Sequence, residues 1–134
     1  MRELRLNVTS DPAHLAPVRR AVEAFCAACG FVNASICEVG LCVNEAMANI
    51  TSHAYEGATD RPVLIGAHFD NNTLELTLRD WGSGCDPSQV PTKRDPLAPG
   101  GLGMVCLRKL MDDVSYEPQP DGMLLTLRKR RLGG

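Results

Sequence analysis

The first third of the chain shows a strand pattern followed by a helical pattern. Residues 4–8 alternate apolar and polar side chains, which predicts a β-strand. The Ser-Asp-Pro triplet at 10–12 is typical of a helix start. Apolar residues then recur at steps of three and four as far as Gly30, which we expect to end the helix: Leu15, Val18, Val22, Phe25 and Cys29. Pro17 lies inside this pattern, so we expect it either to kink the first turn or to delay the regular helix.

The next apolar stripe predicts a longer helix that begins between residues 33 and 35 and continues to position 54. Its core side consists of Ile36, Val39, Val43, Met47, Ile50 and Ala54. Glu45, Asn49 and His53 lie off that stripe at successive i, i+4 positions, so they form one polar row on the helix surface. Because the apolar neighbours indicate a partly buried helix, this polar row needs a partner.

The remainder predicts two β-hairpins separated by a loop. Strands over 62–69 and 73–80 flank a short Asp-Asn-Asn connection, and a helix over 104–113 precedes a closing hairpin with Asp-Gly at its turn. Residues 81–103 hold five glycines and four prolines and lack periodicity, which is typical of a functional or disordered loop. The order β-α-α-β-β-loop-α-β-β predicts an α+β two-layer sandwich, with a mixed, largely antiparallel sheet and helices on one face.

Composition narrows the function classes. A chain of 134 residues predicts a single domain over 1–134. A net charge of −2 does not favour binding to nucleic acid, and the basic run at 128–131 is typical of a solvated tail. No signal peptide and no membrane-spanning stretch is found, so we expect a cytoplasmic protein. The six cysteines are then expected to be reduced core residues, and the Cys26-x-x-Cys29 pair lacks a second pair to complete a zinc site.

Two glycine-containing segments suggest nucleotide chemistry. Asp80 ends a predicted strand, where its carboxylate can accept a hydrogen bond from an exocyclic amine such as that of adenine. Gly82 and Gly84 follow, and glycine lets a backbone approach a flat base closely. The Gly-Gly-Leu-Gly-Met segment at 100–104 opens a helix, and such a segment offers N–H donors to phosphate oxygens.

The polar row supplies the complementary groups. Asn49 offers a neutral oxygen ligand of the kind Mg²⁺ prefers, and Glu45 lies one turn earlier, where a carboxylate can accept a proton. Each feature alone has an ordinary alternative. Glycine pairs mark turns, a Glu/Asn pair is usually a solvated helix face, and His53 alone is more often a packed or surface histidine. Their order in the chain, each in the expected secondary structure, favours a nucleotide site.

With these motifs the chain resembles the GHKL ATPases, whose ATP-binding domain has the Bergerat fold, and within them the anti-sigma-factor serine/threonine kinases. Asn-Glu-Ala-Met-Ala-Asn-Ile-Thr-Ser-His-Ala-Tyr at 44–55 resembles their N box, and Arg-Asp-Trp-Gly-Ser-Gly at 79–84 resembles their first glycine box. Residues 100–117 resemble their second box with the helix and strand after it, and 121–127 resemble the closing strand. Since 4–31 also resemble their first strand and helix, the similarity spans essentially the whole chain.

The resemblance implies a role for each matching position. It implies ATP and Mg²⁺ as cofactors, Asn49 as the Mg²⁺ ligand and Glu45 as the catalytic base. Residues 85–100 would form the ATP lid. The remaining nucleotide-binding positions that it implies are Asp80, Gly82, Gly84 and Thr126 around adenine, Gly101 and Gly103 at the phosphates, and Lys93 and Arg94 as lid cations. Cys85 stands where relatives often have a larger apolar residue.

The implied activity is transfer of the ATP γ-phosphate to a serine or threonine of a small STAS-type antagonist, with a sigma factor as a second candidate partner. The resemblance also allows a homodimer, although the sequence does not fix the oligomeric state. Three alternatives remain open: a non-catalytic ATP-binding module, the catalytic module of a histidine kinase, and a glycine-rich α/β domain without nucleotide.

Overall fold

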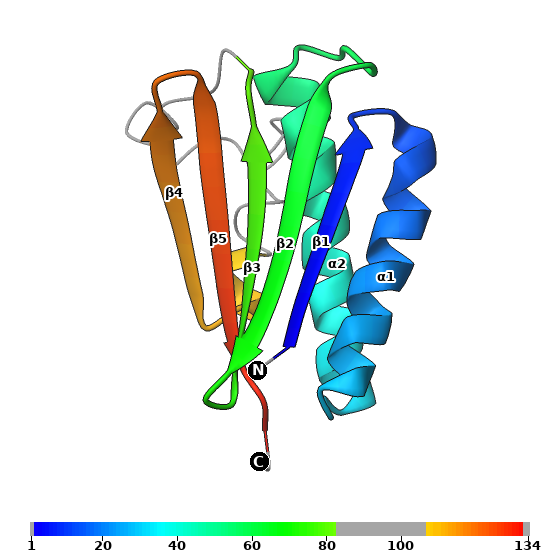
Figure 1. Cartoon of the computed structure of the whole chain (residues 1–134), viewed down its shortest axis with the longest axis vertical. Coiled ribbons are helices and arrows are strands. Elements are labelled where there is room, and N and C mark those ends of the chain that lie inside the picture. The colour runs from blue at the N-terminus through cyan, green and yellow to red at the C-terminus, as the bar shows by residue number, and fades with distance from the viewer. Residues whose placement is uncertain (1, 83–106, 133–134) are drawn as a thin grey trace.

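A five-stranded sheet carries two helices on one face, as Figure 1 shows for the computed structural model, which describes residues 2–82 and 107–132. The strands follow the order β1-β2-β3-β5-β4, and every neighbouring pair among them is antiparallel. Their bounds are β1 Arg2–Thr9, β2 Pro62–Asp70, β3 Thr73–Asp80, β4 Asp113–Gln119 and β5 Gly122–Arg130. The predicted two-layer α+β sandwich is confirmed, and its described strand pairs contain no parallel ladder.

Both hairpins close through two-residue turns. Asn71 and Asn72 connect β2 to β3 with φ values of 50° and 65°. Two successive positive φ values are the geometry of a type I′ turn, for which asparagine is one of the preferred residues. In the closing hairpin Gln119 pairs with Gly122, so the turn residues are Pro120 and Asp121 and the glycine is already the first residue of β5.

The first helix begins with a short 3₁₀ segment. Asp11 caps η1 (Pro12–His14) by accepting a hydrogen bond from the Ala13 N–H at 2.9 Å, and the α-helix α1 (Leu15–Ala28) follows. Pro17 is the third residue of α1, where a helix needs no amide hydrogen bond, so it delays the regular helix rather than kinking it. Gly30 ends the helix as predicted, with φ of +87° that an L side chain rarely adopts.

The second helix changes its geometry before it ends. The α-helix α2 (Asn33–Asn49) continues into a π-helix, η2 (Ile50–Ala54), in which the Tyr55 N–H bonds to the Ile50 carbonyl at 3.0 Å. The prediction of one regular helix as far as position 54 is therefore wrong beyond Asn49. Glu45 and Asn49 remain one α-helical turn apart, but His53 lies in the wider turn and does not continue their i, i+4 row.

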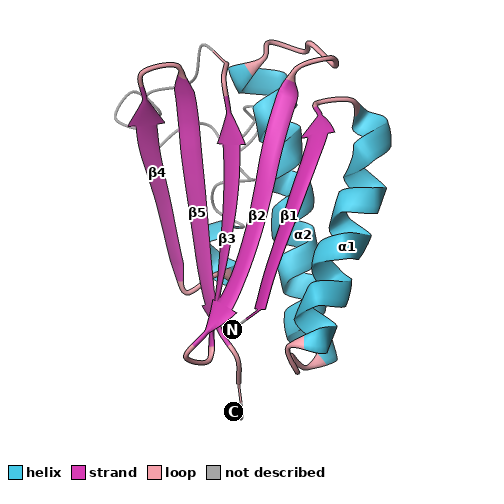
Figure 2. Ribbon diagram, in the orientation of Figure 1, coloured by secondary structure: helices cyan, strands magenta, loops and turns pink. Residues whose placement is uncertain are grey.

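The predicted helix over 104–113 is only partly within the described residues. Residues 107–110 are helical (Figure 2), and the chain bends at Met111 and Asp112 before β4 begins. The helix therefore ends earlier than predicted, because Asp113 already pairs with Arg128 of β5. The buried Lys129 ammonium donates to the carbonyl oxygen of Leu110 at 2.5 Å, which satisfies one of the free carbonyls at this helix end.

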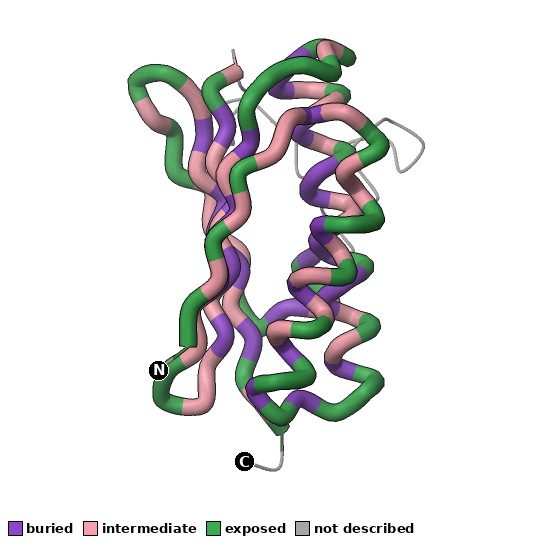
Figure 3. Tube along the Cα trace, turned by 45° about the vertical axis from the view of Figure 1, so that its right-hand side comes forward, coloured by how far each residue is buried: buried purple, intermediate pink, exposed green. Residues whose placement is uncertain are grey.

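The core lies between the sheet and the helices, where Figure 3 shows the buried positions of both layers facing each other. Leu74, Leu76 and Leu78 of β3 point into it and are at most 1% exposed. Cys26 and Cys29 are also buried, are not bonded to each other, and belong to this core. Burial raises the pKa of the Cys26 thiol to about 12, so this cysteine is not a thiolate near neutral pH.

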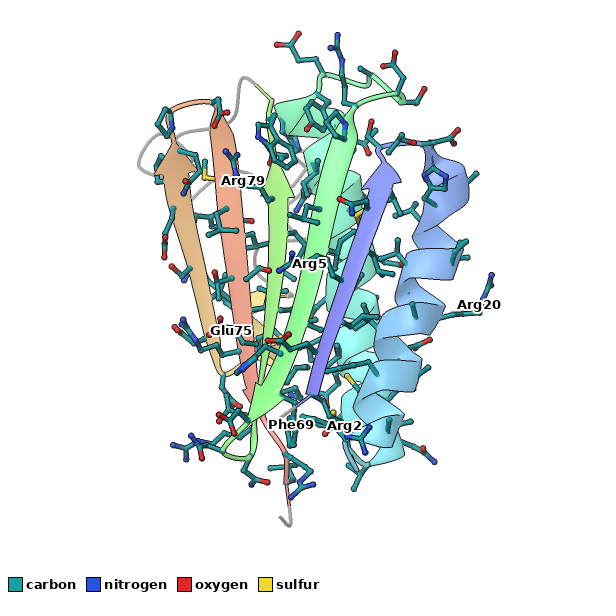
Figure 4. The ribbon with its side chains drawn as sticks, in the orientation of Figure 1. Arg2, Arg5, Arg20, Phe69, Glu75 and Arg79 are labelled. Atoms are coloured by element: carbon teal, nitrogen blue, oxygen red, sulfur yellow. The ribbon has the colours of Figure 1, made fainter. Side chains whose placement is uncertain are left out.

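The opposite face of the sheet carries polar and charged side chains. Figure 4 labels Arg5, Glu75 and Arg79 on it, and Arg128 of β5 pairs there with Glu75 and with Asp113, at 2.9 Å in each case. The alternation along β3 therefore separates a core face from a polar face. No helix of the described residues is long and apolar enough to span a membrane.

We expect Leu76→Ala to lower the free energy of unfolding by about 2–5 kcal/mol, because it leaves a cavity in the centre of the core. Thr77→Ala, the neighbouring residue on the polar face, is the matched control and should cost about 1 kcal/mol or less. Urea denaturation followed by circular dichroism measures both values. Equal effects at the two positions would contradict the described register of β3.

Candidate functional site

A buried carboxylate marks the end of β3. Asp80 is 3% exposed and points to the helix side of the sheet, since it continues the inward series of Leu74, Leu76 and Leu78. One of its oxygens accepts the Gly82 N–H at 3.0 Å. Burial raises the pKa of Asp80, against the lowering effects of the Gly82 N–H, the Arg79 charge and a backbone hydrogen bond from Met123.

The main chain after Asp80 lies directly against the end of η2. A Cβ atom on Gly82 would collide with the carbonyl oxygen and carbon of Ala54, so only glycine fits at this position without a backbone shift. The sequence prediction gave Gly82 a role in letting the backbone approach a base. The structure shows that its small size is first required by contact with the protein itself.

Tyr55 holds the same two segments together. Its hydroxyl donates to the Pro62 carbonyl oxygen at 2.5 Å and accepts the Trp81 N–H at 2.7 Å. The side chain is 8% exposed, and burial raises its pKa. One hydroxyl therefore ties the start of β2 to the residue that follows Asp80. No role was predicted for Tyr55 from the sequence, although its place directly after the polar row was a usable signal.

Glu45 and Asn49 are half-buried on the side of α2 that faces away from α1. A Cβ on Gly40 would collide with Glu23 of α1, so Gly40 marks the α1 side of the helix. Glu45 lies five residues later, about 140° further round the helix. Figure 1 shows α2 behind β1 and β2 and α1 beside it, to the right of β1, so the side of α2 remote from α1 faces the region of β3 and β5.

Neither the Glu45 carboxylate nor the Asn49 amide forms a hydrogen bond or ion pair with another residue of 2–82 or 107–132. The two side chains are one turn apart, about 6 Å along the axis. Half-buried polar groups without protein partners are available to a ligand. In the same described ranges, no group of three or more histidine, cysteine, aspartate or glutamate residues could hold a metal ion.

An open cleft of about 410 Å³ lies beside this region, and it is lined by Ala54, Tyr55, Glu56, Arg61, Pro62, Trp81 and Gly82. The Trp81 ring is 41% exposed, and the Arg79 guanidinium stacks on it at 4.6 Å from the ring centre. Because the lining includes none of Glu45, Asn49 or Asp80, this cleft adjoins the candidate site without containing its polar groups.

The structure does not bring Thr126 to the candidate site. Thr126 pairs with Thr77, and both lie on the polar face of the sheet, whereas Asp80 points to the core face. The residue of β5 that pairs with Asp80 is Met123. Thr126 lies three residues after Met123, an odd number of steps along the strand, so its side chain points away from the face that carries Asp80, and the structure does not support the expectation that Thr126 lies near the base.

The other expected nucleotide contacts lie outside the described residues. These are Gly84, Lys93, Arg94, Gly101 and Gly103, together with the lid at 85–100 and Cys85 within it. The described part of the candidate site therefore consists of Asp80 and Gly82 at the end of β3, and Glu45 and Asn49 on α2.

This arrangement suits a flat polar ligand with an extended anionic group. Asp80 offers an acceptor beside the main chain of Gly82. Asn49 offers an amide oxygen, and Glu45 a carboxylate further along the same helix. An amine-bearing base at Asp80 and a metal-bound phosphate chain along α2 match these groups in order.

Comparison with known proteins shows the family of the chain. Residues 8–129 match the histidine kinase-like ATPase domain family. The chain is 30% identical over 125 residues to the anti-sigma F factor of Halalkalibacterium halodurans, covering 88% of this chain and 84% of that protein. It is 26% identical over 121 residues to the serine-protein kinase RsbW of Listeria innocua, covering 84% and 77%.

A solved structure shows the same fold. The crystal structure of the RsbU and RsbW domains of a Mycobacterium tuberculosis protein superposes with a TM-score of 0.74 at 14% sequence identity. The match covers 98% of this chain and 32% of that longer one. At this identity the likeness concerns the fold alone.

We expect Asp80→Asn to leave the free energy of unfolding at pH 7 equal to or above that of the wild type. Because burial raises the pKa of Asp80, the folded protein binds this proton more tightly than the unfolded chain does. The contribution of Asp80 to the free energy of unfolding therefore falls as the pH rises from 3.8, the ordinary pKa of aspartate, through the raised pKa of the folded protein. The difference in free energy of unfolding between Asp80→Asn and the wild type should therefore become smaller as the pH falls towards 3.8.

Urea denaturation at several pH values measures this difference. Glu117→Gln, at an exposed carboxylate of β4, is the control and should not change the pH profile. A lower stability of Asp80→Asn at pH 7 would show that the ionised carboxylate stabilises the fold, contrary to this account.

Proposed function

The chain belongs to the histidine kinase-like ATPase family, and we propose that it is an ATP-dependent serine/threonine protein kinase of the anti-sigma-factor type. The observation that carries the proposal is the pair formed by Glu45 and Asn49. Both are half-buried, both lack protein partners among the described residues, and they share the side of α2 that faces the strand ending at Asp80.

Nucleotide recognition would begin at the base. The Asp80 carboxylate accepts a hydrogen bond from the exocyclic amine of adenine, and the ring lies beside the main chain of Gly82, whose N–H bonds to the same carboxylate. The buried acceptor favours a base that carries an amine at this position over one that carries a carbonyl. Phosphate contacts by Gly101, Gly103, Lys93 and Arg94, and a base contact by Gly84, remain predictions from the sequence.

Mg²⁺ fits the donor set of α2. Asn49 supplies one neutral oxygen, and Mg²⁺ usually takes its other ligands from substrate phosphates and water rather than from an all-protein cage. When bound, the ion neutralises charge on the phosphate oxygens. The residues of the chain orient the nucleotide around it, with Asp80 at the base end and Asn49 at the phosphate end.

In the transfer step the acceptor hydroxyl of the partner attacks the γ-phosphorus. A new oxygen–phosphorus bond forms, the bond to the β,γ-bridging oxygen breaks, and ADP leaves with that electron pair. The hydroxyl proton passes to the Glu45 carboxylate. Phosphoryl transfer depends mainly on positioning and charge stabilisation, so one placed carboxylate beside a bound metal nucleotide meets most of its demands.

The names of the two curated relatives guide the choice of partner. One is called an anti-sigma factor and the other a serine-protein kinase. The partner proposed here is a small STAS-type antagonist whose serine or threonine is phosphorylated in the cytoplasm, and a sigma factor is the second partner that the unphosphorylated antagonist releases. A homodimer of this chain is compatible with the proposal.

A non-catalytic ATP-binding module is the second candidate. Such a module would use Asp80, Gly82 and Asn49 in the same way, since these residues are proposed only to bind the nucleotide and its metal ion. Glu45 separates the two functions, because a protein that only binds nucleotide has no need of a proton acceptor one turn from the metal ligand.

We expect Asn49→Ala to weaken ATP binding in the presence of Mg²⁺ and to have a smaller effect in EDTA. The physical reason is that the amide oxygen acts on the nucleotide through the metal. Isothermal titration calorimetry of the wild type and of Asn49→Ala in both buffers gives the comparison. An equal loss of affinity with and without Mg²⁺ would assign Asn49 a structural role instead.

We expect Glu45→Gln to leave ATP affinity nearly unchanged and to slow phosphorylation of the partner by at least about 100-fold, the lower end of the range for a general base. Glutamine keeps the size of the side chain and removes its basicity. The assay uses radiolabelled ATP and a STAS-type protein encoded near this chain. Exposed Glu117→Gln is the matched control and should retain full activity.

Two outcomes would change the proposal. A wild-type protein that binds ATP and the partner without ever transferring phosphate would leave the binding module as the function. Transfer by Glu45→Gln at the wild-type rate would keep the kinase and remove Glu45 as its base.

A further inference from the structure

The guanidinium of Arg79 joins three parts of the chain where β3 ends. One of its Nη atoms donates to the carbonyl oxygen of Asp80, and the other donates to the carboxylate of Asp121 at 2.5 Å. The guanidinium carbon also lies over the Trp81 ring, 4.6 Å from the ring centre. Figure 4 labels Arg79 at this end of the sheet and Glu75 nearer the other end. Arg79 therefore contacts the main chain of Asp80, the next side chain and the turn between β4 and β5.

The turn between β4 and β5 closes on the same peptide group. A Cβ atom on Gly122 would collide with the Asp80 carbonyl oxygen and with the Arg79 guanidinium. The Arg79 side chain is 18% exposed, although its partner Asp121 is 64% exposed. The charge of Arg79 is therefore held close to Asp80 and is screened less than the charge of a fully solvated arginine.

The Arg79 charge acts on the Asp80 carboxylate from the other face of the sheet. Burial raises the pKa of Asp80. The rise in pKa is opposed by the Gly82 N–H, the Arg79 charge and a main-chain hydrogen bond from Met123. Of these three, Arg79 alone carries a full charge. A nearby positive charge favours the ionised form of a carboxylic acid, and an ionised carboxylate is a stronger hydrogen-bond acceptor than the neutral acid.

The other elements around Asp80 carry groups of a different kind. β2 places the apolar Val63 opposite Asp80 in the ladder. Beyond η2 lies the Tyr55 phenol, whose pKa is raised by burial and, to a smaller extent, by the Asp80 charge. On α2 the Glu45 carboxylate lies on the side that faces β3. Among the described residues, Arg79 is therefore the one positive side chain that acts on Asp80.

We propose that Arg79 is a positioning residue of the nucleotide site, which acts from the polar face of the sheet on the Asp80 acceptor of the core face. Its hydrogen bond to the Asp80 carbonyl and its stack on Trp81 hold the main chain that carries the acceptor. Its charge favours the form of the carboxylate that accepts a hydrogen bond best. The inference rests on the proposed function for the ligand alone, because the effect of Arg79 on Asp80 is already present in the free protein.

Arg128 is the matched control on the same face. Its guanidinium bonds to two carboxylates, those of Glu75 and Asp113, at 2.9 Å in each case. Glu75 precedes Asp80 by five residues, which is about 16 Å along a strand. That distance exceeds the Debye length of about 10 Å at 0.1 M salt, so the Arg128 charge should hardly reach Asp80. Arg128→Met therefore removes an equal charge from the polar face at a distance from the site.

The first test follows the ionisation of Asp80 in the free protein. The Gly82 N–H bonds to the Asp80 carboxylate, so a pH titration of the Gly82 amide NMR signal reports this ionisation. We expect Arg79→Met to titrate at a higher pH than the wild type, because loss of a nearby positive charge raises the pKa of a carboxylic acid. Arg79→Lys keeps the charge and should titrate closer to the wild type. Arg128→Met should titrate as the wild type does.

Asp121→Asn serves if Arg79→Met does not fold. It keeps Arg79 and removes the negative charge paired with it, so the Gly82 signal should titrate at a lower pH than in the wild type. Opposite directions in Asp121→Asn and Arg79→Met cannot arise from a general loss of stability.

The second test measures adenosine affinity by calorimetry across a range of pH. Where Asp80 is ionised in every variant, we expect Arg79→Lys and Arg79→Met to bind adenosine about 2- to 10-fold more weakly, the value of one hydrogen bond. An ammonium lacks the planar fork and the stack that hold the main chain. As the pH falls, Arg79→Met should lose its affinity first, since its Asp80 takes up a proton at a higher pH. Arg128→Met should follow the wild type throughout.

The outcomes separate this inference from the proposed function. An unchanged Gly82 titration in Arg79→Met, or an equal shift in Arg79→Met and Arg128→Met, would overturn the action of Arg79 on Asp80. Wild-type adenosine affinity in both Arg79 variants, with lowered stability, would make Arg79 a structural link to the turn between β4 and β5 only. A wild-type protein that binds no nucleotide would overturn the proposed function. The Gly82 titration would still decide whether Arg79 acts on Asp80, so the two failures are distinguishable.

Discussion

The candidate site depends on one close backbone contact, where the main chain at Gly82 lies against the carbonyl of Ala54. No side chain larger than hydrogen fits at position 82 without moving one of the two segments. The contact brings the end of β3 to the end of η2, although the two segments are almost 30 residues apart in the chain. The Tyr55 hydroxyl reinforces it by bonding to main-chain groups of Trp81 and Pro62. The relative position of Asp80 and α2 therefore follows from backbone packing and not from flexible side chains.

Polar groups at this junction reduce the stability of the free protein. The Asp80 carboxylate is buried, and its raised pKa shows that burial disfavours the charged form. The Nε2 atom of His53 is buried and has no hydrogen-bond partner among residues 2–82 and 107–132. Elsewhere in the described residues, the inward positions of β3 are filled by leucine. Proteins commonly retain such unfavourable groups where a ligand needs them, at a cost in stability.

Periodicity was sufficient to predict the layers and most strands of this fold. The alternating pattern around β2 and β3 identified both strands and the short turn between them, because one face of the sheet is buried and the other is polar. The π-helical turn at Ile50–Ala54 could not be predicted in this way. Its apolar residues fit an α-helical stripe equally well, and the tie between Thr51 and Ser10 is a tertiary contact without a local sequence signal.

The error at Thr126 has a different origin, because the information was present in the sequence. Leu125 and Leu127 flank it, and both point to the core, so strict alternation directs Thr126 to the polar face. The resemblance to the family's closing strand placed Thr126 near the base, and this placement was not compared with the alternation of side chains along the strand. For Glu45, Asn49 and Asp80, the family motif and the periodicity of the chain indicated the same side-chain directions. The structure places these residues on elements that face one another.

The most direct test of this account is to map ATP binding on the wild-type protein by the backbone amide NMR signals. The account predicts that a non-hydrolysable ATP analogue with Mg²⁺ shifts the signals of Asn49, Ala54 and Gly82, on the helix side of the sheet. The signals of Thr77 and Thr126 on the polar face should change little. Shifts concentrated on the polar face, or no shifts at saturating nucleotide, would contradict a nucleotide site at the junction of β3 and α2.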